Sequence, residues 1–142
     1  MYITAQDLEE AFSQRALIEL SNDSSRATAV DEHVLNLAIR YACETIDGYL
    51  RSRYELPLET VPTIVRNIAL QLARYWLYSR RPEGRGLPES VRDDYKQALK
   101  DLEAIQSGKF HLGLPDATEN DLVPEPLKFK VIAPSPIDTS GY

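Results

Sequence analysis

Residues 63–80 read TIVRNIALQLARYWLYSR, the most apolar long stretch of the chain. Ile64, Ile68 and Leu72 recur every four residues, a spacing that places them on one face of a helix. The same face continues with Ala73, Trp76 and Leu77, and it is widened by Val65, Ala69 and Tyr75. So broad an apolar face is typical of a helix at the centre of a core. We therefore predict that this helix is packed by the rest of the chain.

The segments on either side of the central helix also have a helical period, with apolar residues three and four positions apart. In the first segment this apolar stripe comprises Leu8, Ala11, Phe12, Ala16 and Leu17. The sequence predicts an all-α fold, a small four-helix domain with helices at about 4–19, 32–53, 63–80 and 88–107.

Residues suited to helix ends support these boundaries. Thr4, followed three residues later by Asp7, is a weaker form of the capping box, and Asp31 is a suitable N-cap for the second helix. Gly108 is placed to cap the C-terminus of the fourth helix. The sequence therefore divides into a helical domain over residues 1–107 and a different segment over residues 108–142.

The C-terminal segment has no helical period and holds five of the nine prolines. Two short stretches in it alternate apolar and polar residues, as half-buried strands do. The apolar members of these stretches are Phe110 and Leu112 in the first, and Leu127, Phe129 and Val131 in the second. We predict an extended, proline-rich C-terminal arm with short β-like segments, which gains structure against a partner.

The composition is that of one soluble domain of 142 residues, 43% of them hydrophobic. A chain of this length buries roughly 68% of the surface that its unfolded form exposes, enough for a core without disulfides or metal. Cys43 is the single cysteine, so no intramolecular disulfide is expected, which fits a reducing cytoplasm. The apolar runs are too short to span a bilayer and the N-terminus lacks the pattern of a secretion signal, so we expect neither.

The negative charge lies mainly in the first part of the chain. Residues 1–60 hold five basic and eleven acidic side chains, whereas residues 61–107 hold eight and six. Non-specific affinity for nucleic acid comes mostly from cations that displace phosphate counterions. The sequence therefore argues against a general DNA or RNA binder, and against docking on anionic lipid.

The sequence shows no recognisable reactive centre. The two histidines, His33 and His111, lie far apart and have no partner at metal-ligand spacing. Cys43 lies at the edge of an apolar helical face, which favours a small buried side chain over a nucleophile. We expect no enzyme activity, no catalytic residue, no cofactor and no metal site.

Four arginines, Arg74, Arg80, Arg81 and Arg85, cluster around the end of the central helix. One interpretation is a solvated turn whose cations oppose the negative end of the helix dipole. The other is an interface with the acidic surface of another protein or another copy, as in a head-to-tail ring. The candidate interface with another subunit or another protein then comprises Arg74, Arg80, Arg81, Arg85, Phe110, Leu112, Leu127, Phe129 and Val131.

Four blocks of the sequence, and the order in which they follow one another, resemble a known protein family. They are the N-terminal YIT, IDGYLRSRYELPL at 46–58, LARYWLY at 72–78 and DYKQALKDLEAIQSGK at 94–109. Together they are similar to the head-completion or connector proteins of the head-to-tail joining region of Mu-like phages and prophages. The resemblance covers about residues 1–114, and none of its blocks is a catalytic signature.

The resemblance implies a structural virion protein, a head-tail connector or adaptor subunit. In such families the copies form a ring, commonly twelve-fold, under the portal protein, and they provide the surface on which the tail or a tail-side completion or terminator protein docks. It further implies a location in the virion, and in the host cytoplasm during assembly. The acidic balance suits a ring through which DNA passes without specific binding, because like charge lets the duplex slide. No membrane partner is expected.

A small helical DNA-binding regulator remains the alternative. Arg66, Asn67 and Arg74 on the central helix are the only obvious residues to read bases. The connector ELPLETVP that precedes this helix is longer than the usual turn of a helix-turn-helix motif. A salt-dependent gel shift separates the two functions.

Overall fold

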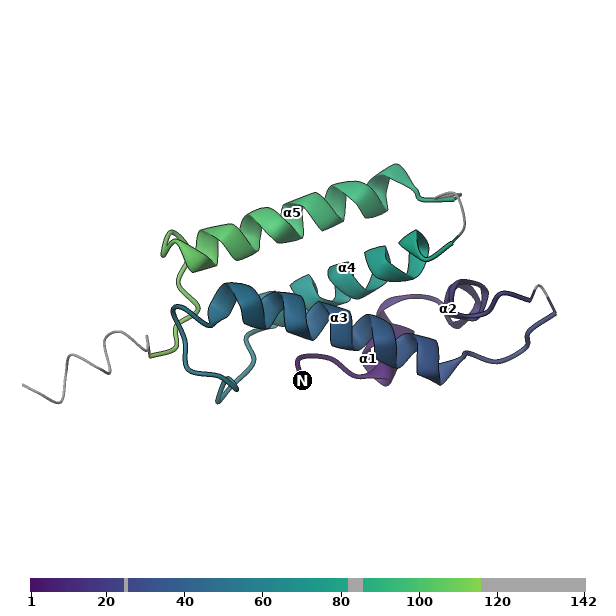
Figure 1. Cartoon of the computed structure of the whole chain (residues 1–142), viewed down its shortest axis with the longest axis horizontal. Coiled ribbons are helices and arrows are strands. Elements are labelled where there is room, and N and C mark those ends of the chain that lie inside the picture. The colour runs from purple at the N-terminus through teal and green to yellow at the C-terminus, as the bar shows by residue number, and fades with distance from the viewer. Residues whose placement is uncertain (25, 82–85, 116–142) are drawn as a thin grey trace, which may run out of the picture.

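Two antiparallel helices, α3 (Glu32–Leu50) and α4 (Thr63–Ser79), form the centre of the fold (Figure 1). Each of them packs against every other helix of the structure, a computed structural model that describes residues 1–24, 26–81 and 86–115. The expectation that the most apolar helix lies at the centre is confirmed. The buried residues of α4 are Val65, Ile68, Ala69, Leu72, Ala73 and Leu77.

The remaining helices cover the two sides of this central pair. Helix α5 (Glu89–Gln106) runs antiparallel to α4 and contacts only α3 and α4 among the described helices (Figure 1). Helices α1 (Ala5–Ala11) and α2 (Gln14–Ser21) lie against the other side of the pair. The described residues contain five helices and no strand, and none of these helices has the length and apolar character needed to cross a bilayer.

The prediction of one helix over residues 4–19 is wrong, because the first helix ends before Phe12 and a second helix begins at Gln14. Phe12 has extended backbone angles, φ −126° and ψ 156°, and ends α1. Ser13 then accepts a hydrogen bond at its Oγ from the backbone N–H of Ala16, 3.1 Å away, and caps α2. The domain therefore has five helices instead of four. The break also leaves Ala11 exposed, although its spacing predicted a core position.

The other predicted helix boundaries agree with the structure to within a few residues, and the expected caps are present. Thr4 and Asp7 form a complete capping box, and Asp31 accepts hydrogen bonds from the backbone N–H groups of His33 and Val34. Gly108 follows α5 with a φ of +87°, a left-handed conformation that favours glycine. The caps predicted at Thr4, Asp31 and Gly108 are therefore confirmed.

The segment after α5 is held on the helical body by Tyr54. The phenolic oxygen of this buried residue accepts a hydrogen bond from the backbone N–H of Leu112 at 3.1 Å, and its ring meets that of His111 edge-on at 6.0 Å. The β-like segment predicted at Phe110 and Leu112 is therefore wrong, since Leu112 bonds to a side chain and forms no strand ladder. The second predicted segment, 127–131, lies outside the described residues.

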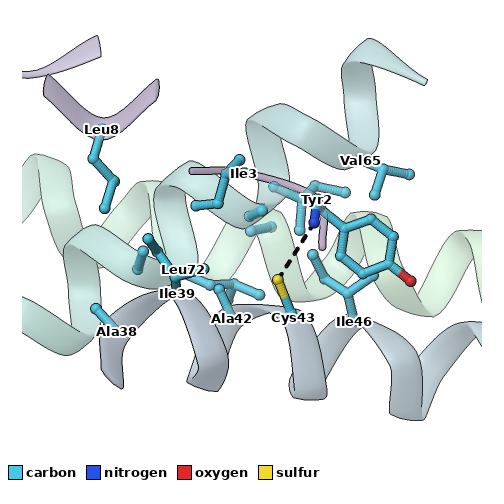
Figure 2. Close-up of a cluster of buried hydrophobic side chains, with 14 of the residues drawn as sticks. Tyr2, Ile3, Leu8, Ala38, Ile39, Ala42, Cys43, Ile46, Val65 and Leu72 are labelled. Carbon is cyan, nitrogen blue, oxygen red and sulfur yellow. Dashed lines mark hydrogen bonds between the residues drawn. The ribbon is translucent and has the colours of Figure 1, made fainter. Parts of the chain in front are cut away.

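The N-terminal residues Tyr2 and Ile3 are part of the core (Figure 2). The Tyr2 backbone N–H donates to the Sγ of Cys43 at 3.5 Å, and its hydroxyl donates to the carboxylate of Asp47. Both contacts tie the chain start to α3. The expectation that Cys43 is a small buried side chain is confirmed.

Gly48 gives a direct test of helix energetics. It is exposed in α3, and a Cβ added there would meet no atom within 4 Å. Alanine has a higher helix propensity than glycine, so Gly48→Ala should raise the free energy of unfolding by about 1 kcal/mol, measured by urea denaturation.

Gly108→Ala serves as the opposite control. Its φ is positive, and an added Cβ would lie 2.6 Å from the Nη1 of Arg53, so this variant should be less stable than the wild type. A loss of stability in Gly48→Ala would contradict the assignment of Gly48 to an open, exposed helix surface.

Candidate functional site

Arg74, the first of the candidate interface residues, joins three elements of the helical body. Its Nη2 donates to the Oδ2 of Asp94 on α5 at 2.6 Å and to the Oε1 of Gln71 at 2.9 Å. Its guanidinium carbon lies 4.8 Å from the centre of the Phe12 ring, between α1 and α2. The Arg74 side chain is only 21% exposed. The Arg74 side chain is therefore held against the helical body and is not free in solvent.

Arg80 is also engaged within the molecule. Its Nη1 donates to the backbone carbonyl of Leu20 at 2.8 Å, and its Nη2 lies 3.2 Å from the Oδ1 of Asp23. Leu20 belongs to the last turn of α2, where the carbonyls have no partner within the helix and the dipole is negative. Arg80 thus caps α2 from the end of α4.

Arg81 lies at the boundary of the described residues. Its guanidinium carbon is 5.9 Å from the centre of the Tyr78 ring. Arg85 lies outside the described residues. The three described arginines of the cluster thus contact different partners within the molecule.

The apolar candidates differ in exposure. Phe110 is 43% exposed, and within the described residues the only other exposed large hydrophobic side chain is Met1. Leu112 is partly buried against the core. Leu127, Phe129 and Val131 lie outside the described residues. Phe110 is therefore the best-placed described apolar candidate for contact with another protein.

A groove of about 410 Å³ between α4 and α5 was not predicted from the sequence. Ile64 and Ile68 of α4 and Ala98 of α5 line it together with the carboxylates of Asp94 and Asp101. One signal in the sequence indicates which residues of the two helices face each other across this groove. In antiparallel helices, residues equidistant from the connecting turn lie opposite each other, as Arg74 and Asp94 do on either side of residue 84.

Tyrosines occupy the junction of α3, α4 and α5. The rings of Tyr75 and Tyr95 stack with centroids 3.7 Å apart and planes 11° from parallel. Burial, and next a hydrogen bond to Tyr95, raise the pKa of Tyr41 to about 12. At the N-terminus, burial and then the hydrogen bond to Asp47 raise the pKa of Tyr2 well above its usual value. Both phenols are neutral at physiological pH.

The described residues contain no group of three or more His, Cys, Asp or Glu side chains that could hold a metal ion. His33 is exposed in the first turn of α3. Of the residues considered for base reading, Arg66 lies 3.4 Å from the Oδ1 of Asp7, and Arg74 is paired with Asp94. Both arginines thus already have a carboxylate partner.

Comparisons with known proteins give one consistent result. A family model described as "Bacteriophage Mu, Gp36" matches residues 2–131. The chain is 32% identical over 119 residues to the "Mu-like prophage FluMu protein gp36" of Haemophilus influenzae, covering 84% of this chain and 80% of that protein. It is 27% identical over 117 residues to "Gene product J" of Escherichia phage Mu, covering 82% and 79%.

The contacts of Arg74 predict a structural effect of its removal. Arg74→Ala loses a charge-assisted hydrogen bond and the contact with the Phe12 ring, and should lower the free energy of unfolding by about 1–2 kcal/mol in urea denaturation. The exposed Arg92→Ala on α5 is the matched control and should change it by less than about 0.5 kcal/mol. Equal effects of the two variants would contradict the structural role of Arg74.

The two tyrosines with raised pKa values predict alkaline destabilisation. In the unfolded chain each phenol loses its proton near its ordinary pKa of 10, before it does so in the fold. Their contribution to stability is therefore complete below pH 10 and falls as the pH rises from about 10 towards 12. Urea denaturation across this range should show a smaller fall for Tyr2→Phe with Tyr41→Phe than for the wild type. An unchanged fall in the double variant would contradict these pKa directions.

Proposed function

Because the chain belongs to the bacteriophage Mu Gp36 family, we propose that it is a structural subunit of the connector between the phage head and tail. In this role, copies of the chain assemble as a ring under the portal protein. The ring provides the surface on which the tail, through a completion or terminator protein, docks. The observation that carries the proposal is the family match over residues 2–131, together with the connector-like order of sequence blocks within it.

The distribution of charge supports contacts between copies. Glu9 and Glu10 of α1 and Glu32 of α3 border one acidic hollow on the surface. Arg81 follows the end of α4, where Arg80 is already occupied by α2. Opposite charges at separate places on one subunit, the acidic hollow and Arg81, suit a heterologous, head-to-tail interface, the kind that closes into a ring.

The charge balance also supports a passage for DNA without specific binding. The chain has a formal net charge of −6, which is multiplied around a ring. Arg66, Arg74 and Arg80 each have a carboxylate within 4 Å, so these cations are partly neutralised. Weak attraction to phosphate lets a duplex move past the protein. The same pairing weakens the alternative of a DNA-binding regulator.

The proposed role is structural and involves no catalysis. The protein acts by contact with other copies, the portal and a tail-side protein, in the virion and, during assembly, in the host cytoplasm. Phe110 is the described residue that we expect to contribute most to such a contact, because its apolar ring is exposed.

Deletion of the gene from a prophage that encodes this chain tests the role. Without a connector, induction should yield DNA-filled heads and complete tails that fail to join, visible by electron microscopy. Wild-type protein and the control Arg92→Ala should restore tailed particles when supplied from a plasmid. Phe110→Asp should restore few, because a charge replaces the exposed apolar contact.

Tailed particles from the deletion strain would contradict the connector role. So would a strain that makes no heads or tails, since that result places the protein in regulation. A gel shift with duplex DNA at physiological salt separates these functions further, because a connector that lets DNA pass should give no shift.

A further inference from the structure

The groove between α4 and α5 combines an apolar floor with an acidic rim. Ile68 and Ala98 at its floor are each only 3% exposed, and Ile64 is partly buried beside them. Asp94 and Asp101 come from the same side of the groove, seven residues apart on α5. Such a surface suits a short apolar segment that carries positive charge.

One of the rim carboxylates has no cation beside it among the described residues. Asp94 is paired with Arg74, but Asp101 accepts a hydrogen bond only from the neutral Nε2 of Gln97, at 2.9 Å. The groove lining contains no lysine or arginine. Its net charge is therefore negative and favours a basic occupant.

The described part of the chain ends at Pro115, on a different hollow from this groove. Leu114 and Pro115 line that hollow together with Leu58 and Glu59, which belong to the connector that leads into Thr63 at the start of α4 and of the groove. From there, 27 further residues extend to Tyr142. The eleven residues 116–126 span at most about 40 Å when extended, whereas the groove residues 63–71 cover only about 12 Å of helix.

Residues 127–131, LKFKV, have the composition that the groove requires. In an extended segment Leu127, Phe129 and Val131 share one face, and Lys128 and Lys130 share the other. These two lysines are the only cations in the sequence beyond Pro115. Long lysine stems allow the ammonium groups to bend back to the rim while the apolar face is covered.

From this complementarity we propose that residues 127–131 dock in the α4–α5 groove of their own subunit. The apolar face packs against the exposed part of Ile64, above the buried Ile68 and Ala98, and the lysines approach the carboxylates of Asp94 and Asp101. A short tether gives the segment an effective concentration on the order of mM, which favours its own groove over that of another copy in dilute solution. This contact does not depend on the connector role.

Paramagnetic broadening in nuclear magnetic resonance spectra of the full-length chain tests the proposal. In a Cys43→Ala background, a nitroxide is attached at Ala133→Cys, two residues beyond the segment. Backbone amide signals of 63–71 and 94–101 should lose intensity, and the loss should disappear when the nitroxide is reduced. Phe129→Glu in the same labelled chain is the matched control, and it should abolish the broadening.

A charge exchange adds a test of specificity. Asp101→Lys should weaken the broadening, and Lys128→Glu with Lys130→Glu in the same chain should restore it. A merely non-specific apolar contact would not respond in this way.

A mixed sample shows whether the occupant comes from the same chain or from a second copy. It contains isotope-labelled chains that carry no nitroxide and unlabelled chains that carry one. No broadening in the mixture, with broadening in the single-chain sample, supports docking within one subunit. Broadening in the mixture assigns the groove to a second copy and overturns the proposal. Broadening confined to residues 54–59, or absent altogether, overturns it as well.

Discussion

The fold depends on the burial of the apolar surface that α3 and α4 share. Leu35 and Ile39 of α3 and Leu72 and Leu77 of α4 are almost completely removed from water. Fully burying one such side chain contributes about 1.5–3 kcal/mol, far more than a surface ion pair of about 0–1 kcal/mol. Because α4 is apolar around most of its circumference, no single neighbour can cover it. Helix α5 on one side and α1 with α2 on the other complete the cover.

Much of this arrangement is readable from the sequence, because helical periodicity and end caps are local signals. The break at Phe12 was missed because the apolar spacing of Leu8, Ala11 and Phe12 continues across it. The chain begins a new helix at this point although the apolar spacing continues. Ser13 caps that helix with a single hydrogen bond, which the apolar spacing does not reveal. The burial of Tyr2 depends on Cys43 and other distant residues, which no local pattern reveals.

In the candidate site, too, local patterns could be read from the sequence but contacts between distant residues could not. Clustering in the sequence singled out the arginines, but Arg74 and Arg80 contact Asp94 and Leu20, which lie in other helices. Such pairings follow from how helices pack, so composition alone does not distinguish a basic surface from a set of internal contacts. The exposure of Phe110 likewise results from the turn that follows Gly108 and from the docking of Leu112 on Tyr54.

These features describe a helical body held together by internal contacts, with several distinct features on its surface. The internal arginine contacts secure α2 and α5 to the central pair, while an acidic hollow, an exposed phenyl ring and a rimmed groove remain on the outside. The chain belongs to the bacteriophage Mu Gp36 family, and these surface features are the ones on which its proposed role in assembly rests.

Native-state hydrogen exchange of backbone amides tests the central claim most directly, because it measures the stability of each helix separately. Amides in the interiors of α3 and α4 should exchange only through global unfolding, with a free energy equal to that of the whole chain. Amides of α1 and α2 should exchange through local opening of these helices, at a lower free energy. Exchange from the interior of α4 that is faster than from α1 would contradict the claim that the α3–α4 pair supports the rest of the fold.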